Sequence, residues 1–297
     1  MSRRSLRVEM LQIAALGARG LGDSAELVKD RLLRGHGPLG GGGADRDGRD
    51  DLYYTIFWLA CLEALGVKPP DPFATRTFVD SHEDIERLDL VHLGALARCR
   101  AALHLQEPAR EKAILHRIES FRSLDGGYDG NSSNPTGNAY AAFVAFGAYQ
   151  DLGHEIPAPL ELVRSLKRLE SKDGAWGNFP ALPKGSTNPT SAAVTLLSQL
   201  QMPLNPSVAD WLLGQVHPQG GFLAMPLAPI PDLLSTATAL HALACLETPV
   251  PAAIKEACLD FVDSLWSAEG GFHGHWNDDH LDAEYTFYGL LALGHLL

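Results

Sequence analysis

The chain repeats one pattern of apolar and polar positions every 46 to 50 residues. A glycine-containing turn followed by an aromatic residue occurs four times, at Gly126-Gly127-Tyr128, Gly174-Ala175-Trp176, Gly220-Gly221-Phe222 and Gly270-Gly271-Phe272. The successive spacings are 48, 46 and 50 residues. A repeat of this length is typical of a helical hairpin, which buries its apolar face by stacking on its neighbours.

Each repeat predicts two helices of different character. Before the last turn, apolar residues recur with a helical period over residues 254–265, and charged residues occupy the opposite face. After the turns, residues 236–246 and 286–297 carry almost no charge on any face. We therefore expect half-exposed outer helices and enclosed inner helices.

Two further repeats complete the pattern. Residues 51–65 mirror residues 282–296 and follow a glycine run that begins at Gly40. The 86 residues between Gly40 and Gly126 leave room for one degenerate unit, whose inner helix is predicted to begin at Asp89. The chain is thus predicted to contain about six hairpins.

Six such hairpins predict an all-α fold, an α/α toroid of the α6/α6 type, because a closed ring leaves no apolar end to cap. An open solenoid is the alternative. The expected organisation is a single domain over residues 1–297, with an N-terminal helix and lead-in at 1–22 and repeats at 23–297. The turns should gather around one mouth of a central cavity.

Composition excludes some classes of partner. The chain has 297 residues, 45% of them hydrophobic, and a net charge of -12, which disfavours nucleic acids and anionic membranes. No apolar run reaches the length of a membrane span. The cysteines form no CxxC pair and suit reduced thiols, so we expect a cytoplasmic protein; they are Cys61, Cys99, Cys245 and Cys258.

The repeats resemble those of protein prenyltransferase β subunits and triterpene (squalene-hopene) cyclases. Residues 169–176 are similar to the QW repeat of the cyclases, with Glu170 at the usual glutamine position. The units at Gly220 and Gly270 look more like the transferase β subunits. The resemblance implies an isoprenoid or other apolar small molecule as ligand, transferase activity, and a separate helical-repeat α subunit as a possible partner.

In the transferases, the resemblance implies a zinc ion bound by an Asp, by a Cys two residues later and by a His of the final repeat. The matching positions here are Asp232, Leu234 and Tyr285. Leucine cannot ligate a metal and tyrosine is an uncommon zinc ligand, so this zinc site is not expected as the family builds it. The loop of residues 223–231, where the family places cations for a prenyl diphosphate, carries no charge.

In the cyclases, the resemblance implies a DxDD acid that protonates an alkene, which requires a carboxylic acid kept protonated by its neighbours. Residues 277–284 are acidic but do not spell that motif. Cyclisation is therefore expected only in an altered form.

Aspartates recur where inner helices are predicted to begin, at Asp51, Asp89, Asp232 and Asp282. Each can act as an N-cap. If the ring closes, the same carboxylates also meet around the mouth, where repulsion would raise some pKa values or attract a cation. The candidate catalytic residues are Asp232, Asp282 and Tyr285.

Residues 273–284 hold three histidines and four carboxylates, a plausible set for zinc or another divalent ion. The candidate metal ligands are Asp232, Asp279, His280 and Asp282. The alternative is a loop that is polar only because it is solvated.

Several aromatic residues fall on the predicted inner helices and suit an isoprenoid chain, although they also suit a packed core. The candidate substrate-binding residues are Tyr54, Trp58, His92, Tyr140 and Tyr288. The aromatic group also includes Tyr53, Phe143, Tyr285 and Phe287. The isolated histidines His92, His241 and His295 are also expected as hydrogen-bonded core residues.

Three hypotheses follow. The first is a prenyltransferase β-subunit-like protein with an apolar cavity, acting on or binding an isoprenoid without the family's zinc site. The second is a non-catalytic toroid that binds a lipid or a protein. The third is an altered cyclase or a metal-dependent enzyme that uses the Asp and His cluster at the mouth.

Overall fold

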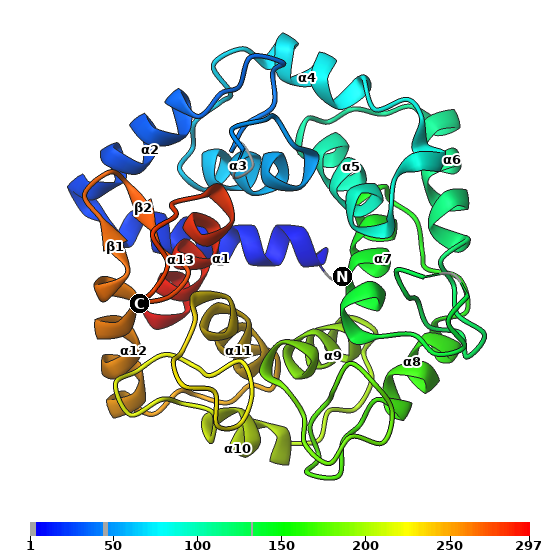
Figure 1. The fold of residues 1–297 in the computed structure, drawn as a ribbon, viewed down its shortest axis with the longest axis vertical. Coiled ribbons are helices and arrows are strands. Elements are labelled where there is room, and N and C mark those ends of the chain that lie inside the picture. The colour runs from blue at the N-terminus through cyan, green and yellow to red at the C-terminus, as the bar shows by residue number, and fades with distance from the viewer. Residues whose placement is uncertain (1–3, 44–46, 132) are drawn as a thin grey trace.

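The computed structural model describes residues 4–43, 47–131 and 133–297, in which helical hairpins form a closed ring (Figure 1). The inner helices are α3 (Leu52–Ala64), α5 (Leu90–Ala102), α7 (Ala139–Asp151), α9 (Thr187–Gln199), α11 (Leu233–Cys245) and α13 (Ala283–Leu296). The outer helices are α2 (Ala25–Arg34), α4 (Pro72–Asp80), α6 (Pro108–Glu119), α8 (Pro159–Arg168), α10 (Ser207–Leu213) and α12 (Ala252–Ser264). Each inner helix packs on the next, and α13 packs on α3. The toroid prediction is confirmed, and the open solenoid is wrong because the last hairpin packs on the first.

Side-chain caps start most of the inner helices. Asp51, Asp89, Asp232 and Asp282 each accept a hydrogen bond from the backbone N–H three residues later, as Asn138 does on α7. These bonds satisfy amides that a helix leaves without an internal partner. The inner helix predicted to begin at Asp89 is therefore present as α5.

A buried threonine four residues after the cap joins several inner helices to the turn before them. The Thr190 hydroxyl accepts from the Trp176 N–H at 3.0 Å, and the Thr236 hydroxyl accepts from the Phe222 N–H at 2.9 Å. Both threonines are fully buried. The bond satisfies a buried backbone donor and holds each turn against its own inner helix.

Each glycine turn is a short hairpin, and at Gly126, Gly220 and Gly270 the turn lies directly against the next outer helix. In the last unit, β1 (Trp266–Ser267) pairs antiparallel with β2 (Gly271–Phe272). At Gly270 the backbone has a φ of 90°, and a Cβ there would lie 2.2 Å from the carbonyl oxygen of Leu27 on α2. Only glycine fits this contact, which joins the last unit to the first.

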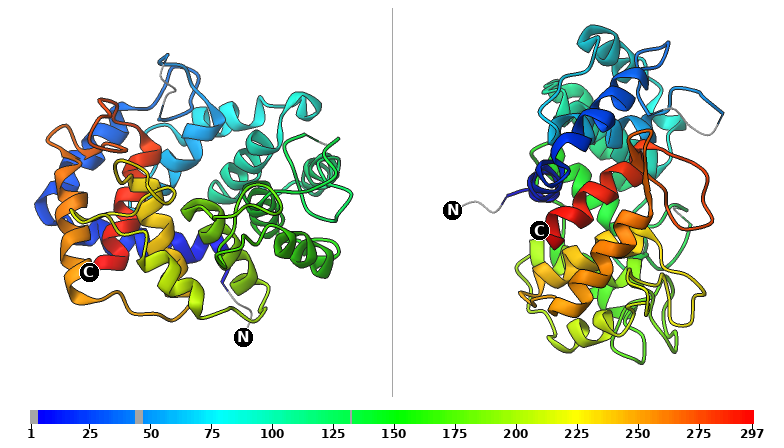
Figure 2. Two further views of the ribbon diagram at one scale, coloured as in Figure 1. Left: turned by 60° about the horizontal axis from the view of Figure 1, so that its bottom comes forward. Right: turned by 90° about the vertical axis from the view of Figure 1, so that its left-hand side faces the viewer.

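The N-terminal helix α1 (Leu6–Gly20) covers one end of the ring. It packs on α13, α3 and α7, and Figure 2 shows it on the side opposite the turns. A Cβ on Gly17 would lie 1.9 Å from the Leu290 carbonyl oxygen, so the α1 and α13 backbones cross in close contact. The short 3-10 helices η1 (Gly22–Ser24) and η2 (Ile85–Arg87) connect elements. Among the described residues, no helix is long and apolar enough to cross a membrane.

Candidate functional site

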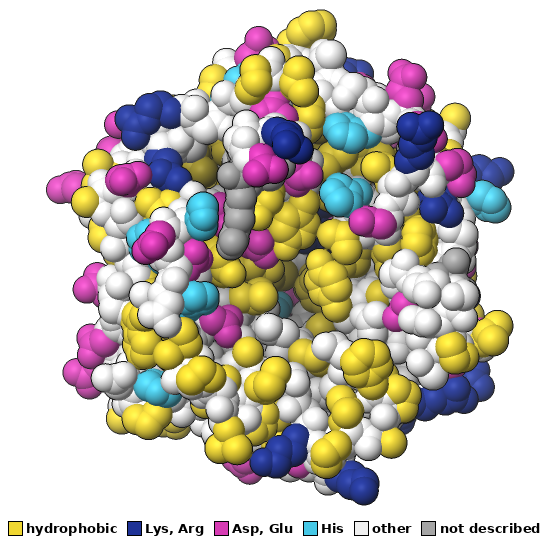
Figure 3. Space-filling model, in the orientation of Figure 1, with side chains coloured by type: hydrophobic (Ala, Val, Ile, Leu, Met, Phe, Trp, Pro, Cys, Tyr) yellow, Lys and Arg dark blue, Asp and Glu magenta, His cyan; other side chains and the backbone are white. Residues whose placement is uncertain are grey.

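The ring encloses a cavity of about 260 Å³ that is lined by all six inner helices, with Met10 of α1 at the closed end. This volume lies just below the roughly 300–1,000 Å³ typical of ligand pockets. Figure 3 looks into the open end and shows a hollow with hydrophobic side chains around it. A ligand can enter through the open mouth, past the turns.

The cap of each inner helix sets which side chains face the cavity. Two, five and six residues after the cap Asp282 come Glu284, Phe287 and Tyr288, and all three line the cavity. The same three positions line it on α3, α5, α7 and α9, and two of them do so on α11. A spacing of three and four residues places side chains on one helix face, so a common cap gives a common register.

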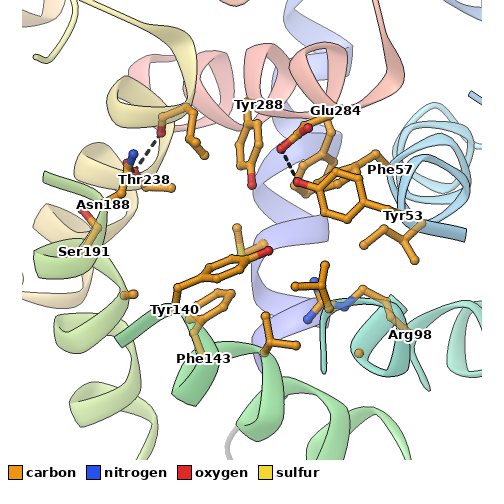
Figure 4. Close-up of a pocket in the computed structure, with 18 of the residues that line it drawn as sticks. Tyr53, Phe57, Arg98, Tyr140, Phe143, Asn188, Ser191, Thr238, Glu284 and Tyr288 are labelled. Atoms are coloured by element: carbon orange, nitrogen blue, oxygen red, sulfur yellow. Dashed lines mark hydrogen bonds between the residues drawn. The ribbon is translucent and has the colours of Figure 1, made fainter. Parts of the chain in front are cut away.

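Aromatic side chains form the wall contributed by α3, α7 and α13. The ring centroids of Tyr53 and Phe57 are 5.2 Å apart in a T-shaped contact, and those of Phe57 and Tyr288 are 5.7 Å apart. Tyr140 and Phe143 of α7 face them across the cavity in Figure 4. Edge-to-face packing fixes these rings and leaves apolar surface toward a ligand.

Glu284 places a carboxyl group inside this aromatic wall. The Tyr53 hydroxyl donates a hydrogen bond of 2.6 Å to it (Figure 4). Burial raises the pKa of Glu284 to about 7, with the neighbouring Asp282 adding to the rise and the Tyr53 hydrogen bond opposing it. Near neutral pH the cavity therefore contains a carboxylic acid that still holds its proton in a large fraction of molecules.

The three tyrosines of the aromatic wall remain protonated at any physiological pH. Burial raises the pKa of Tyr53, of Tyr140 and of Tyr288, and the charge of Glu284 adds to each rise. Their hydroxyl groups are thus hydrogen-bond donors and acceptors within an apolar space.

Arg98 of α5 is the only arginine or lysine among the described residues that line the cavity. Its Nε lies 2.9 Å from the carboxylate of Asp151 on α7, which also pairs with Arg7 of α1 at 3.4 Å. Because a buried carboxylate shared by two cations holds both in place, Arg98 serves first to join α5, α7 and α1.

The wall formed by α9 and α11 is polar but uncharged. The Thr238 hydroxyl donates to the Asn188 side-chain oxygen at 3.0 Å. The Ser191 hydroxyl is buried and has no hydrogen-bond partner among the residues that the structure describes. A ligand hydroxyl or carbonyl group would find its polar partners on this side, opposite the aromatic wall.

The histidine at the mouth is held by two capping aspartates. His92 lies 2.8 Å from Asp89 and 3.6 Å from Asp51. The hydrogen bond to Asp51, followed by the interactions with Asp89, raises the pKa of His92 to about 9 against the effect of burial. The ring is partly exposed and charged at neutral pH, so His92 is not the core residue expected, and it does not line the cavity.

The positions that match the transferase zinc ligands lie near the mouth. Leu234 lines the cavity, while both carboxylate oxygens of Asp232 accept hydrogen bonds from Ser235. Burial raises the pKa of Asp232. Tyr285 packs under the loop at Gly274, and burial raises its pKa to about 12.

The acidic and histidine-rich loop of residues 273–284 is organised by local bonds. Asp278 accepts from the N–H groups of Gly274 and His280, and His273 contacts the His280 carbonyl oxygen. In the part of the chain that the structure describes, one group of side chains offers three ligand atoms close enough for a metal ion, and it is not on this loop. Asp232, Asp279, His280 and Asp282 are therefore not brought together as one ligand set.

The expected binding residues divide into two groups. Tyr140 and Tyr288 line the cavity, whereas Tyr54 and Trp58 do not. Trp58 is fully buried between α3 and α2, where its indole N–H donates to the Leu32 carbonyl oxygen at 2.7 Å. Trp58 lies seven residues after the Asp51 cap, outside the register that faces the cavity.

The expected core histidines His241 and His295 do contact each other. Nδ1 of His241 lies 3.2 Å from Nε2 of His295. Burial lowers the pKa of His241 to about 4, and burial with the neighbouring His241 lowers the pKa of His295 to about 3. Both rings are thus neutral at physiological pH.

Sequence analysis missed Glu284 as a site residue, and with it the polar group formed by Asn188, Ser191 and Thr238. The sequence places Glu284 at the end of the acidic and histidine-rich stretch of residues 273–284, whereas in the structure it is the second residue of α13. The signal that identifies it is the register of the cap, since Glu284 occupies the position on α13 that Tyr53 occupies on α3.

Residues 190–296 match the family described as Prenyltransferase alpha-alpha toroid domain. The chain has the prenyltransferase α/α toroid fold. No curated protein sequence matches the chain. The predicted resemblance to prenyltransferases and terpene cyclases is thus confirmed for the fold.

Solved structures extend the likeness to the rest of the toroid. The type II terpene cyclase MstE from Scytonema has a TM-score of 0.63 at 13% identity, covering 94% of this chain and 97% of that chain. A protein from Actinoplanes has a TM-score of 0.56 at 18% identity, over 92% and 98%. Candida albicans protein geranylgeranyltransferase-I, complexed with GGPP, has a TM-score of 0.55 at 14% identity, over 99% and 91%.

Proposed function

We propose that the toroid binds a short isoprenoid in its central cavity and that Glu284 protonates a carbon–carbon double bond of this ligand. The observation that carries the proposal is the position of the Glu284 carboxyl group, which accepts a hydrogen bond from Tyr53 and lies within the aromatic wall of the cavity. A carboxylic acid in an apolar site keeps its proton until a substrate accepts it.

The fold comparison supports the choice of ligand. MstE has been solved with geranylgeranyl dihydroxybenzoate as substrate and with merosterolic acid A as product. The cavity of about 260 Å³ favours a chain of farnesyl rather than geranylgeranyl length. The polar wall of α9 and α11 would receive the oxygen-bearing end of the molecule.

The reaction needs no co-reactant. The O–H bond of Glu284 breaks, and its proton forms a C–H bond with the electron pair of the alkene, leaving a carbocation on the chain. A second double bond attacks the cation and forms the ring C–C bond. Loss of a proton from an adjacent carbon to the Glu284 carboxylate restores an alkene and the acid, so the product is an isomer of the substrate.

Tyr53, Phe57, Tyr140 and Tyr288 have a role in this scheme. The face of an aromatic ring attracts a cation by about 2 kcal/mol or more when water is excluded. Rings on two sides of the cavity would therefore stabilise the carbocation while the apolar wall keeps water from trapping it.

Prenyl transfer is less well supported by the residues present. Leucine occupies the position of the thiolate ligand at Leu234, and Arg98 is paired with Asp151. A diphosphate needs several fixed cations to leave water, and the wall offers one that is already paired. The acid is placed at Glu284 rather than at Asp232 or Asp282, because the carboxylates of these two aspartates cap helices.

The test is to incubate the protein in D₂O with farnesol and with farnesyl dihydroxybenzoate and to analyse the extract by mass spectrometry. The expected product is an isomer of the substrate in which deuterium replaces one carbon-bound hydrogen. Glu284→Gln should abolish turnover and keep binding, whereas the exposed control Glu269→Gln should retain both. Binding without turnover in the wild type would overturn the cyclase proposal in favour of a non-catalytic isoprenoid-binding toroid.

A further inference from the structure

A second cluster of ligating side chains lies at the closed end of the ring, apart from Glu284. Glu9 of α1 and His241 and Cys245 of α11 each offer one ligand atom, and these atoms all lie within 4.8 Å of one another. His241 and Cys245 are four residues apart and share one face of α11. The structure brings Glu9 to them from a helix more than 200 residues away in the sequence.

One nitrogen of this cluster lacks a partner. His241 is 3% exposed, and its buried Nε2 atom makes no hydrogen bond within the described part of the chain. An unsatisfied buried polar atom costs about 1–3 kcal/mol, so it calls for an explanation. The other ring nitrogen, Nδ1, lies 3.2 Å from Nε2 of His295. When Nδ1 carries the proton and donates to His295, Nε2 keeps a lone pair that a metal ion can accept.

The carboxylate of Glu9 is held in position by glutamine side chains of the inner helices α9 and α7. The side-chain amide of Gln199 donates to Glu9 at 2.8 Å, and the amide of Gln150 donates to the Gln199 oxygen at 3.0 Å. Gln150 in turn accepts from the N–H of Leu6 at the start of α1. Such outer hydrogen bonds orient the ligands in protein metal sites.

We propose that Glu9, His241 and Cys245 bind a zinc ion that joins α1 to α11. Carboxylate oxygen, imidazole nitrogen and thiolate sulfur are the donors that zinc takes in proteins. Around zinc these donors lie roughly 3–4 Å apart, so the three atoms need to close by about 1 Å at most. The ion satisfies His241, and its fourth position is open to water at the floor of the cavity, which His241 also lines.

The site differs from the one expected at the mouth. α11 begins at the mouth with its Asp232 cap, and His241 and Cys245 lie nine and thirteen residues further along it. The ion would fix α1 as the floor of the cavity. Its existence does not depend on whether Glu284 acts as an acid.

The experiment measures metal in the purified full-length protein by elemental analysis and by the absorption spectrum after replacement with Co²⁺. About one equivalent of zinc and a thiolate-to-cobalt charge-transfer band are expected for the wild type. Cys245→Ser and the isosteric Glu9→Gln should each lose the zinc, and Cys245→Ser should lose the band. Gln199→Leu should weaken zinc binding about 10–100-fold by freeing the Glu9 carboxylate.

Matched controls separate this site from others. Cys258→Ala removes a thiol of α12, Glu63→Gln removes a carboxylate that pairs with Arg7 of α1, and Asp279→Asn alters the mouth. All three should keep zinc and the cobalt spectrum. No stoichiometric zinc in the wild type after incubation with zinc chloride would overturn the proposal. Retention of zinc by both Cys245→Ser and Glu9→Gln would also overturn it, whatever Asp279→Asn does.

Discussion

The hydroxyl group of Tyr53 donates a 2.6 Å hydrogen bond to the carboxylate of Glu284 and so joins the first inner helix to the last. The two residues occupy equivalent positions, each two residues after the aspartate that caps its helix. The ring therefore closes through the same bond that positions the candidate acid. Stability and acid chemistry should be coupled at this point.

Stability should fall as pH rises toward neutrality because of Glu284. Its pKa is about 7 in the folded protein, against an ordinary value of 4.5, so the folded state binds the proton more tightly than the unfolded state. By linkage, the stability is complete below about pH 4.5 and is lost progressively up to about pH 7, by roughly 3 kcal/mol. Urea unfolding of the wild type and of Glu284→Gln from pH 5 to pH 8 measures this.

The Glu284→Gln variant should lack this part of the pH dependence, so its free energy of unfolding relative to that of the wild type should increase with pH. His92 loses its own contribution to stability as the pH rises from its ordinary pKa of 6.5 to its folded pKa of about 9, but both proteins contain His92, so this loss cancels in the difference between them. Parallel curves for the wild type and Glu284→Gln between pH 5 and pH 8 would contradict a raised pKa of Glu284.

Removal of the Tyr53 hydroxyl should raise the pKa of Glu284 further. The hydroxyl donates to the carboxylate and favours its charged form, so Tyr53→Phe removes an influence that lowers the pKa. The pH at which stability is lost should move upward, while the aromatic contact with Phe57 is kept. Tyr54→Phe, one residue away, should leave that pH unchanged. A shift of this pH to lower values in Tyr53→Phe would contradict the prediction, because it would mean that the Tyr53 hydroxyl does not favour the charged form of Glu284.

The ring and its repeats could be predicted from sequence because each element carries its own local signal. The turns show glycine before an aromatic residue, and the caps of most inner helices show aspartate or asparagine. The site was within reach by the same means, since counting two, five and six residues from each cap selects Tyr53, Glu284 and Asn188. Aromatic character alone selected Trp58, which faces α2.

What sequence could not supply was long-range placement. Nothing in residues 6–20 indicates that α1 covers the end of the ring, because its amphipathic pattern would suit any helix on a surface. The approach of Glu9 to His241 and Cys245 depends on that placement. Likewise, the pairing of Arg98 with Asp151 depends on how α5 and α7 pack.

Trp58 and Tyr140 should separate stability from binding. Trp58→Phe leaves a cavity and deprives the Leu32 carbonyl of its donor, so it should lower the free energy of unfolding by about 2–3 kcal/mol with little change in farnesol affinity. Tyr140 is 48% exposed at the cavity, so Tyr140→Ala should weaken farnesol binding and alter stability by about 1 kcal/mol or less. Calorimetric titration and urea unfolding measure the two effects. Loss of affinity in Trp58→Phe at full folding would place Trp58 in the binding site after all.

Ring closure at Gly270 should be far less tolerant of a side chain than the equivalent turn at Gly174. Both glycines have positive φ, of 90° and 83°, so alanine strains both turns by about 1–2 kcal/mol. At Gly270 the new Cβ would also lie 2.2 Å from the Leu27 carbonyl oxygen, whereas at Gly174 it would meet no atom of the described residues within 4 Å, apart from its chain neighbours. Gly270→Ala must therefore push α2 away from the last turn and open the contact between the first and last units. Urea unfolding should show a loss at least about 2 kcal/mol larger for Gly270→Ala than for Gly174→Ala. Equal losses would mean that α2 moves freely against the last turn and that the ring is held closed by the inner helices alone.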